Sequence, residues 1–461
     1  MARIRCAFAV VVALLLLFPG LAASAEAARR PNIIILLADD LGYADLGFQG
    51  SKDIVTPHLD ALARGGIRCT DGYVSCPVCS PTRAGLLTGR SQQRFGYEFI
   101  GGGGKQVVGL PVAEKTMADL LKAAGYATGA IGKWHLGKEP QFHPLTRGFR
   151  ELYGFLGGGR SYFPAKAAAP LAPLDPLLRG RDQVEDPPYL TDAFGQEAAA
   201  FIQRHKREPF FLYVAFNAPH VPLEAPANYL KRFPNIANKG RRTYAAMVGA
   251  LDDAVGRITQ KLHAEGLEKD TLIFFLSDNG GHLGAGARND PLRGQKGTLY
   301  EGGIRVPFVV KWAGQLRAGT TYAQPVSSLD ILATGLSAAG VALPRGRRYD
   351  SVNLLPHLRG KTDRPAHEAL FWRYGDHHAV RSGVWKLTVT AAEPPGLYDL
   401  SNDRGEAKDL SAAEPERLRK LTQLYEAWNA QLPPPAWPPN FLEKGARRPA
   451  PPKSSVPERR K

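Results

Sequence analysis

Long apolar runs without polar alternation recur in the first two thirds of the chain. The clearest of them cover residues 32–39, 209–217 and 271–278. Such runs are typical of parallel strands that are covered on both faces, because neither side of the strand meets water. Stretches with helical spacing of apolar residues lie between the runs, at residues 114–125, 192–206 and 243–265. This alternation predicts an α/β fold with a large mixed, mostly parallel sheet flanked by helices.

The pattern changes after about Pro356. Short segments separated by turn residues follow, which predicts a small antiparallel sheet with a helix near residues 414–432. A length of 461 residues fits two or three domains, so we expect a main α/β domain at residues 31–356 and a small C-terminal α+β domain at residues 357–432. Residues 433–461 form a Pro-rich basic tail, which cannot bury a core and is expected to be extended or disordered.

Residues 1–25 have the features of a secretory signal peptide. Arg3 and Arg5 precede an apolar run at residues 7–18, and a small-residue cleavage site follows at residues 23–25. The apolar run is shorter than the roughly 20 residues that cross a bilayer, and no later segment is apolar enough to do so. We therefore expect cleavage near Glu26, no transmembrane span in the mature chain, and a secreted or periplasmic protein.

The composition narrows the class of protein further. A hydrophobic fraction of 44% excludes general disorder of the chain. With only 4 cysteines in 461 residues, disulfides cannot be what stabilises a fold of this size. The formal net charge of +16 suits a polyanionic partner such as an anionic lipid or a sulfated polymer. Because the sequence contains no nucleic-acid-binding motif, we expect no nucleic acid partner.

Polar residues lie at the end of each of the three apolar runs. They are Asp39 and Asp40 for the first run, residues 217–220 for the second, and Asp278 and Asn279 for the third. Because ligands gather beyond the carboxyl ends of parallel strands, we expect the functional site there. The carboxylate and amide side chains form an all-oxygen set that suits Ca²⁺ or Mg²⁺, whereas no Cys/His cluster suits Zn²⁺. Each pair alone would fit a turn, but two such pairs after two buried strands favour a metal.

The most specific segment is Cys79-Ser80-Pro81-Thr82-Arg83, which precedes a short helix expected at residues 83–88. It resembles the sulfatase signature C-x-P-S/T-R, with Thr82 where many relatives have Ser. Four more segments resemble other sulfatase blocks, in the family's order, at residues 125–137, 217–222, 277–281 and 293–307. With five ordered blocks, the chain is identified as a member of the sulfatase family.

The resemblance implies an alkaline-phosphatase-like fold and a modified residue. In sulfatases the signature cysteine, here Cys79, is converted to Cα-formylglycine (3-oxoalanine), so a formylglycine-generating maturation enzyme is an implied partner. One hydroxyl of the hydrated aldehyde attacks sulfur, and the other expels sulfate as the aldehyde re-forms. By this resemblance Arg83 and Lys133 hold the hydrated aldehyde, and His135 takes the proton that triggers sulfate elimination.

The remaining site residues are also assigned by the resemblance. His220 and Lys296 would bind the ester oxygens, with His220 as the proton donor to the leaving group. Ca²⁺ is the family's usual ion, with Mg²⁺ second, and its implied ligands are Asp39, Asp40, Cys79 in its modified form, Asp278 and Asn279. His282 and Arg293 lie close in sequence to the site and are expected to line the substrate pocket. The implied substrates are sulfated carbohydrates, with aryl sulfates as artificial ones.

Two other functions stay open at this level. A phosphonate or phosphate ester hydrolase of the same superfamily would share the fold and the modified cysteine, and a non-catalytic protein would bind sulfated glycans through its basic excess. A disulfide between Cys69 and Cys76 and the oligomeric state are also open. Gly-rich loops at residues 96–104 and 157–164 follow no predicted strand, and we interpret them as walls of the pocket.

Overall fold

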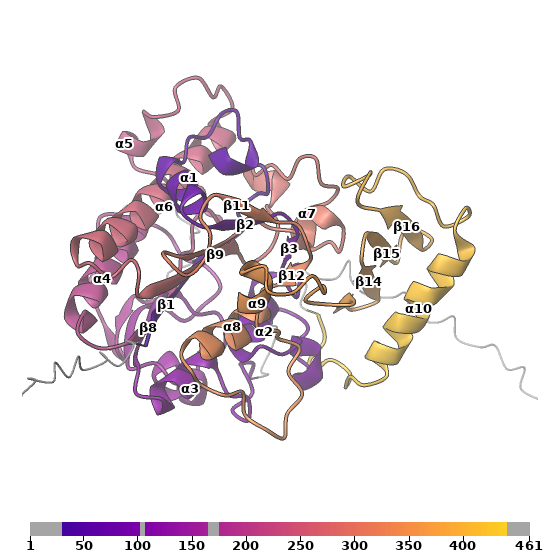
Figure 1. Ribbon diagram of the computed structural model, residues 1–461. Coiled ribbons are helices and arrows are strands. Elements are labelled where there is room, and N and C mark those ends of the chain that lie inside the picture. The colour runs from indigo at the N-terminus through magenta and orange to yellow at the C-terminus, as the bar shows by residue number, and fades with distance from the viewer. Residues whose placement is uncertain (1–29, 102–106, 165–174, 440–461) are drawn as a thin grey trace, which may run out of the picture.

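A ten-stranded mixed sheet forms the main body of the protein (Figure 1). The computed structural model describes residues 30–101, 107–164 and 175–439. In their order across the sheet, the strands are β11 (Thr320–Tyr322), β2 (Ile67–Cys69), β10 (Phe308–Trp312), β9 (Thr271–Ser277), β1 (Asn32–Ala38), β8 (Phe210–Ala215), β4 (Ala127–Lys133), β5 (Glu151–Phe155), β6 (Leu178–Arg179) and β7 (Asp182–Gln183). The central strands from β9 to β5 run parallel, which confirms the predicted fold class.

The three predicted apolar runs become neighbouring strands at the centre of the sheet. β1 pairs with β8 on one side and with β9 on the other, and every residue of the three strands is buried. The register places Ala38 beside Ser277, the last residues of β1 and β9. The residues that follow, Asp39 and Asp278, therefore leave the sheet side by side, and the Asp278 N–H donates to the Ala38 carbonyl at 3.0 Å.

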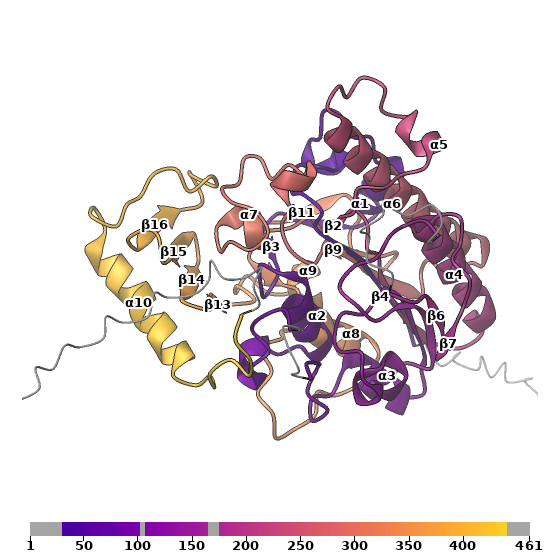
Figure 2. The same cartoon turned by 180° about the vertical axis from the view of Figure 1, so that it is seen from behind.

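Helices cover both faces of the large sheet (Figures 1 and 2). Because side chains alternate along a strand, Ile34 of β1 packs with the helices of one face and Ile35 with those of the other. One face carries α1 (Pro57–Arg64), α4 (Leu190–His205) and α6 (Lys239–Ala264), and the other carries α2 (Cys79–Thr88), α3 (Met117–Ala123) and α8 (Asp330–Ala338).

Short elements connect the larger ones. β3 (Gly72–Tyr73) pairs with β12 (Val326–Ser327) in a sheet of two strands. The short helices are α5 (Ala227–Leu230), α7 (Glu301–Ile304), α9 (Leu355–Leu358), η1 (Gly47–Gln49), η2 (Gln92–Phe95), η3 (Pro140–Phe142), η4 (Pro144–Thr146) and η5 (Leu283–Ala285). Over residues 30–101, 107–164 and 175–439, no helix combines the length and the apolar character that crossing a membrane requires.

Some elements differ from the sequence-based expectation. α6 begins at Lys239 instead of Thr243, because the Asn238 side chain caps it by accepting from the Arg241 N–H at 2.9 Å. α2 begins at Cys79, not at Arg83, with Val78 as the residue before the first turn. β5 was not predicted, so the Gly-rich loop at residues 157–164 does follow a strand.

A separate antiparallel sheet forms the small C-terminal part, which lies at one end of the main body (Figure 2). Its strands are β13 (Leu370–Tyr374), β14 (His377–Ser382), β15 (Trp385–Val389) and β16 (Gly396–Asp399), and α10 (Pro415–Asn429) packs against them. Val380, Leu387 and Leu421 belong to the core between the sheet and α10. The small antiparallel sheet is confirmed, whereas the boundary between residues 356 and 357, which falls inside α9, stays a prediction.

The beginning of the Pro-rich tail packs against the main body, which differs from the expectation of an extended or disordered segment. Trp437 is only 8% exposed, and its Nε1 donates to the Phe99 carbonyl at 3.1 Å. Its ring meets the Tyr97 ring edge-on at 4.8 Å between centroids. Burial of one large aromatic ring with its N–H satisfied outweighs the polar composition around it. Residues 440–461 of the tail and the signal-like segment 1–25 lie outside the described residues.

A buried network of charges joins the C-terminal sheet to the main body. The Nζ of Lys386 on β15 lies 2.9 Å from Glu301 Oε1 on α7 and 2.9 Å from Glu406 Oε1, and all three side chains are fully buried. Glu301 also accepts a hydrogen bond from the Tyr73 hydroxyl at 2.7 Å and pairs with Arg305 at 3.1 Å. Buried charges are tolerated only when they are paired, so this network fixes how the two parts meet.

Replacing Lys386 with Met should leave the Glu301 and Glu406 carboxylates buried without their shared cation. We expect Lys386→Met to lower the free energy of unfolding by about 3–5 kcal/mol, measured by urea denaturation. Lys408→Met is the matched control, since Lys408 is exposed, and it should change stability by less than about 0.5 kcal/mol. A loss below about 1 kcal/mol for Lys386→Met would mean that the network does not hold the two parts together.

Candidate active site

Four polar side chains lie at the carboxyl edge of the central strands. Asp39 and Asp40 follow β1, Asp278 and Asn279 follow β9, and each is at most 1% exposed. Lys133, the last residue of β4, is equally buried. The structure therefore brings together the polar strand ends that the sequence placed at one edge.

Arg83 is the centre of the buried charges. Its Nε and Nη2 lie 3.0 and 2.7 Å from Asp278 Oδ2, and its Nη2 lies 3.4 Å from Asp39 Oδ2. Its Nη1 donates to the Lys133 carbonyl at 2.9 Å, while the Lys133 ammonium lies 2.5 Å from Asp39 Oδ2. Arg83 and Lys133 thus orient the two carboxylates directly beside Cys79, which lies one helical turn before Arg83 on α2.

Asp40 is held by a second set of partners. Lys296 Nζ lies 2.8 Å from Asp40 Oδ2, Asn279 Nδ2 donates to Asp40 Oδ1 at 2.8 Å, and His220 Nε2 lies 3.7 Å from Asp40 Oδ2. Burial disfavours the charge of Asp40, but the Lys296 ammonium outweighs it and holds the pKa of this carboxyl well below its ordinary value. Burial likewise opposes the charge on Lys296, yet Asp40 raises the pKa of the ammonium, so the two stay ionised.

The donor set fits a hard divalent cation. Asp39 Oδ1 and Asn279 Oδ1 are buried oxygens that have no hydrogen-bond partner among the described residues. Ligand atoms of Asp39, Asp278 and Cys79 lie within 4.8 Å of one another, as do those of Asp39, Asp40 and His220. Burial, followed by the Asp39 carboxylate, raises the pKa of Asp278 to about 7, because like charges crowd this site. Free oxygens and crowded carboxylates are what Ca²⁺ or Mg²⁺ would stabilise.

Cys79 lies at the first position of α2, where N–H groups point away from the helix and favour negative charge. Its Sγ is 3.3 Å from His135 Nδ1. Burial raises the pKa of the Cys79 thiol, so the unmodified side chain is a weak nucleophile. Burial, together with Lys133 and Arg83, lowers the pKa of His135 well below its ordinary value, so its ring is neutral and able to accept a proton.

Two site residues have a left-handed backbone. Asp40 has φ 62° and His135 has φ 58°, a region that costs a non-glycine residue about 1–3 kcal/mol. The Ser80 hydroxyl donates to the His135 carbonyl at 2.6 Å, and the Asp40 N–H donates to Asp278 Oδ1 at 3.3 Å. The surrounding hydrogen bonds therefore hold both side chains in orientations that an ordinary strand end would not give.

His220, which follows β8, has a defined hydrogen-bond pattern. Its Nδ1 lies 2.6 Å from the Val221 carbonyl, which can only accept, so Nδ1 carries a hydrogen. The Nε2 that faces Asp40 is then an acceptor in the neutral ring. Because burial lowers the pKa of His220, the neutral ring, in which Nε2 carries no proton, is favoured.

The two residues expected to line the substrate pocket make their contacts with other parts of the chain. Arg293 Nη2 is 2.9 Å from both oxygens of Glu393, and its guanidinium lies over the Tyr300 ring at 3.9 Å. Arg293 therefore faces the C-terminal part of the chain. His282 precedes η5, where its carbonyl accepts from the Ala285 N–H at 3.0 Å. Their role in a pocket stays a prediction.

A cavity of about 290 Å³ lies next to the nucleophile position. It is lined by His135 and Ser80 and by parts of both Gly-rich loops, which were interpreted as pocket walls: Tyr97, Gly101, Gly157 and Gly158. A Cβ at Gly158 would lie 2.6 Å from His135 Nε2, so the bare backbone here is what lets the ring fit. The sequence suggested the loops but not this contact.

Cations and a neutral imidazole surrounding one helix N terminus can bind an anionic ester and move a proton. The fold and the site thus define a hydrolase of anionic esters. Residues 31–341 match the family described as Sulfatase, and residues 295–428 match the family described as N-sulphoglucosamine sulphohydrolase, C-terminal.

Comparison with known proteins gives the same class. Human Arylsulfatase A is 36% identical over 469 residues, covering 90% of each chain, and human N-acetylgalactosamine-6-sulfatase is 35% identical over 456 residues, covering 88% of this chain and 86% of the other. The crystal structure of Ps i-CgsB in complex with k-i-k-neocarrahexaose is 38% identical, with a TM-score of 0.85 over 91% of this chain and 97% of that one. The chain belongs to the sulfatase family and is an enzyme that hydrolyses sulfate esters.

Adding one methyl group at Gly158 should displace the His135 ring. We expect Gly158→Ala to lower kcat for an aryl sulfate roughly 10²-fold, because small displacements of reacting groups have effects of this size. Gly159→Ala is the matched control, since its Cβ would lie at an ordinary 3.6 Å from His220 Cε1, and it should retain most of the activity. Equal activities of the two variants would show that the Gly158 contact does not position His135.

Proposed function

We propose that this sulfatase cleaves sulfate monoesters of sulfated carbohydrates through a formylglycine at position 79, assisted by one bound Ca²⁺ ion. The observation that carries the proposal is the position of Cys79. It lies at the N terminus of α2, 3.3 Å from a neutral His135 and within 4.8 Å of carboxylate oxygens of Asp39 and Asp278.

Modification of Cys79 resolves a chemical difficulty at this position. A buried thiol with a raised pKa is a weak nucleophile, whereas a hydrated aldehyde supplies one hydroxyl that attacks sulfur and a second that releases sulfate. His135, neutral and in contact with this position, accepts the proton of the releasing hydroxyl. Thr82 supports the segment, since its hydroxyl donates to the Cys76 carbonyl at 2.8 Å, as a serine at this position also would.

Charge balance supports a divalent cation. Three carboxylates, Asp39, Asp40 and Asp278, face three cationic groups, Arg83, Lys133 and Lys296, so the side chains alone leave no surplus charge. Ca²⁺, held by these carboxylates, Asn279 and the modified residue 79, would supply the positive charge that neutralises a sulfate ester and favours an ionised hydroxyl. Lys296 and His220, on the more open side of Asp40, would bind the ester oxygens.

The relatives support the proposed class of substrate. N-acetylgalactosamine-6-sulfatase is named for a sugar, and the Ps i-CgsB structure contains the oligosaccharide k-i-k-neocarrahexaose. The net charge of +16 of this chain suits a sulfated polymer. The secreted or periplasmic location expected from residues 1–25 fits such a substrate. Arylsulfatase A supports aryl sulfates as convenient artificial substrates.

Production of the protein beside a formylglycine-generating enzyme tests the nucleophile. The peptide that contains residue 79 should have the mass of the aldehyde or its hydrate, and Cys79→Ala should reduce hydrolysis of an aryl sulfate to the uncatalysed rate. Cys69→Ala is the matched control, since Cys69 is a buried thiol on β2, away from the site. An unmodified Cys79 in a protein that still hydrolyses the ester would refute the proposed nucleophile.

Comparing matched aryl sulfate, phosphate and phosphonate esters in the same assay separates the alternative functions. Sulfate should be turned over fastest, and faster turnover of a phosphorus ester would assign the phosphonate or phosphate hydrolase function instead. Salt-sensitive glycan binding without turnover, unchanged by Cys79→Ala, would indicate the non-catalytic binding protein.

Removal of the cation should remove activity and some stability together. We expect EDTA to abolish turnover of an aryl sulfate and to lower the melting temperature, because a cation that binds only the folded chain stabilises it. Added Ca²⁺ should restore both quantities, and Mg²⁺ should restore them less well. Full activity after exhaustive chelation would rule out the metal in this proposal.

A further inference from the structure

One buried side chain, Asn289, contacts the three backbone stretches that carry the polar groups around Asp40. The first stretch follows β1 and holds Asp40. The other two hold Asn279 and Lys296 and lie in the connection between β9 and α7, to which Asn289 also belongs. Asn289 is 2% exposed. No feature of the sequence pattern pointed to it, and it touches none of the reacting groups itself.

The Asn289 amide uses its full hydrogen-bonding capacity between these loops. Its Oδ1 accepts from the Tyr43 N–H at 3.2 Å and from the Gly281 N–H at 3.0 Å. Its Nδ2 donates to the Gly281 carbonyl at 3.0 Å and to the Gly294 carbonyl at 3.2 Å. Two acceptor sites and two N–H groups are all that a carboxamide offers, so each of them is satisfied by backbone.

Each of these backbone groups is close in sequence to a site residue. Tyr43 follows Asp40, Gly281 follows Asn279, and Gly294 precedes Lys296, each within three residues. The Lys296 N–H itself donates to the Gly281 carbonyl at 3.2 Å. One amide group therefore links the backbone that follows Asp40, the backbone that follows Asn279 and the backbone that precedes Lys296.

The loops leave no room for adjustment at this point. A Cβ at Gly281 would lie 2.6 Å from Gly42 Cα, 2.6 Å from Ala287 Cβ and 2.9 Å from Asn289 Oδ1. Backbone therefore packs directly on backbone around the amide. Because this packing leaves no free space, losing the Asn289 hydrogen bonds would shift the backbone next to the site residues.

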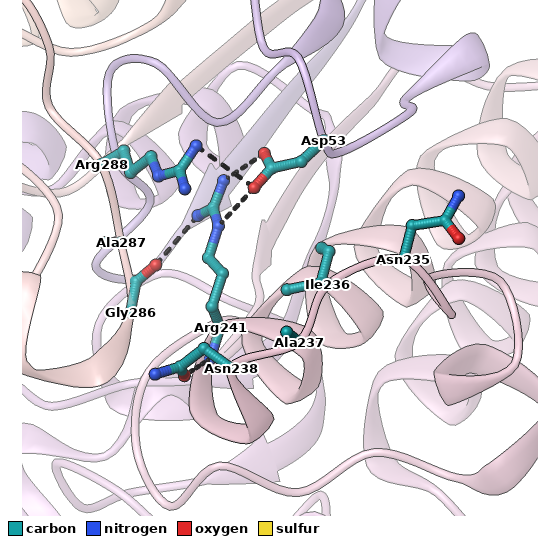
Figure 3. A pocket seen from close by; sticks show the side chains of 9 residues that line it. All are labelled: Asp53, Asn235, Ile236, Ala237, Asn238, Arg241, Gly286, Ala287 and Arg288. Atoms are coloured by element: carbon teal, nitrogen blue, oxygen red, sulfur yellow. Dashed lines mark hydrogen bonds and ion pairs between the residues drawn. The ribbon is translucent and has the colours of Figure 1, made fainter.

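A second set of contacts holds the backbone just before Asn289 by other means. Arg241 Nη1 lies 2.6 Å from Asp45 Oδ1 and donates to the Gly286 carbonyl at 2.9 Å. Asp45 Oδ2 in turn accepts from the Arg288 N–H at 2.9 Å. Figure 3 shows Arg241 between Asp53 and Gly286, along the wall of a cavity of about 470 Å³. The segment that carries Asn289 is thus anchored independently of its amide, so replacing the side chain should leave the fold in place.

We propose that Asn289 is a positioning residue for sulfate ester hydrolysis: it holds Asp40 and Asn279 in place for the cation and Lys296 in place for the ester. This proposal rests on the proposed function, which supplies the cation and the ester. In this role, the Asn289 amide maintains the 2.8 Å contact between the Lys296 ammonium and Asp40. Removing a residue that acts through metal ligands in this way typically changes metal affinity or activity by about 10–100-fold.

Ca²⁺ affinity, measured by isothermal titration calorimetry on protein whose circular dichroism is unchanged, tests the positioning role directly. We expect Asn289→Ala to bind Ca²⁺ about 10–100-fold more weakly than the wild type. Asn235→Ala is the matched control, since Asn235 is an exposed asparagine that lines the same cavity as Arg241, and it should match the wild type. A lower melting temperature with unchanged Ca²⁺ affinity would show a purely structural role and overturn the proposal.

Asn289→Asp is the second variant, in case the alanine variant does not fold. It keeps an acceptor for the Tyr43 and Gly281 N–H groups and loses both donors, including the one to Gly294 near Lys296. We expect KM for an aryl sulfate to rise more than kcat falls, because Lys296 binds the ester. In Lys296→Ala, the same substitution should raise KM little further. Equal, independent effects on KM in both backgrounds would refute the coupling to Lys296.

The wild-type protein distinguishes failure of this proposal from failure of the proposed function. Wild-type protein that neither binds Ca²⁺ nor hydrolyses an aryl sulfate refutes the proposed function, and with it the role of Asn289. Wild-type protein that does both, with Asn289→Ala unchanged in Ca²⁺ affinity and in KM, overturns only the role of Asn289.

Discussion

Three carboxylates buried together at one edge of a sheet are the constraint on which the rest of this structure depends. Asp39, Asp40 and Asp278 are withdrawn from water, and unpaired charges in such a place would oppose folding. Arg83 and Lys133 come from a helix and a strand beneath them, and Lys296 comes from a loop beside them. Each cation is placed by a different element, so the charge balance exists only when the whole sheet has assembled.

This arrangement explains why the site lies where it does in the fold. Parallel strands deliver their carboxyl ends to one edge, and a helix that begins at the same edge adds its N terminus. α2 starts at Cys79, so the residue that the family resemblance marks for modification lies at the positive end of a helix and against His135. Because the three carboxylates and the three cationic side chains balance one another, a bound cation would add the positive charge that an anionic substrate requires.

The small C-terminal sheet is attached to the main body through charges as well. Lys386 lies between Glu301 and Glu406, and Glu301 belongs to the helix that follows the Lys296 loop. The loop that carries Lys296 is therefore bounded on one side by this network and on the other by Asn289. These two sets of polar contacts hold loops at fixed separations, while the apolar cores on the two faces of the sheet hold the strands.

The sequence by itself determined the α/β class, the three central strands, the small antiparallel sheet and the residue types of the site. Apolar runs and motif spacing are local signals, and local signals suffice for strands and for the Asp39, Asp278 and Cys79 positions. Only the tertiary structure decided that α2 begins at Cys79, that Arg83 faces Asp278, and that Arg293 turns toward Glu393. These outcomes, like the roles of Gly158 and Asn289, depend on contacts between residues distant in sequence, which leave no periodic pattern in the chain.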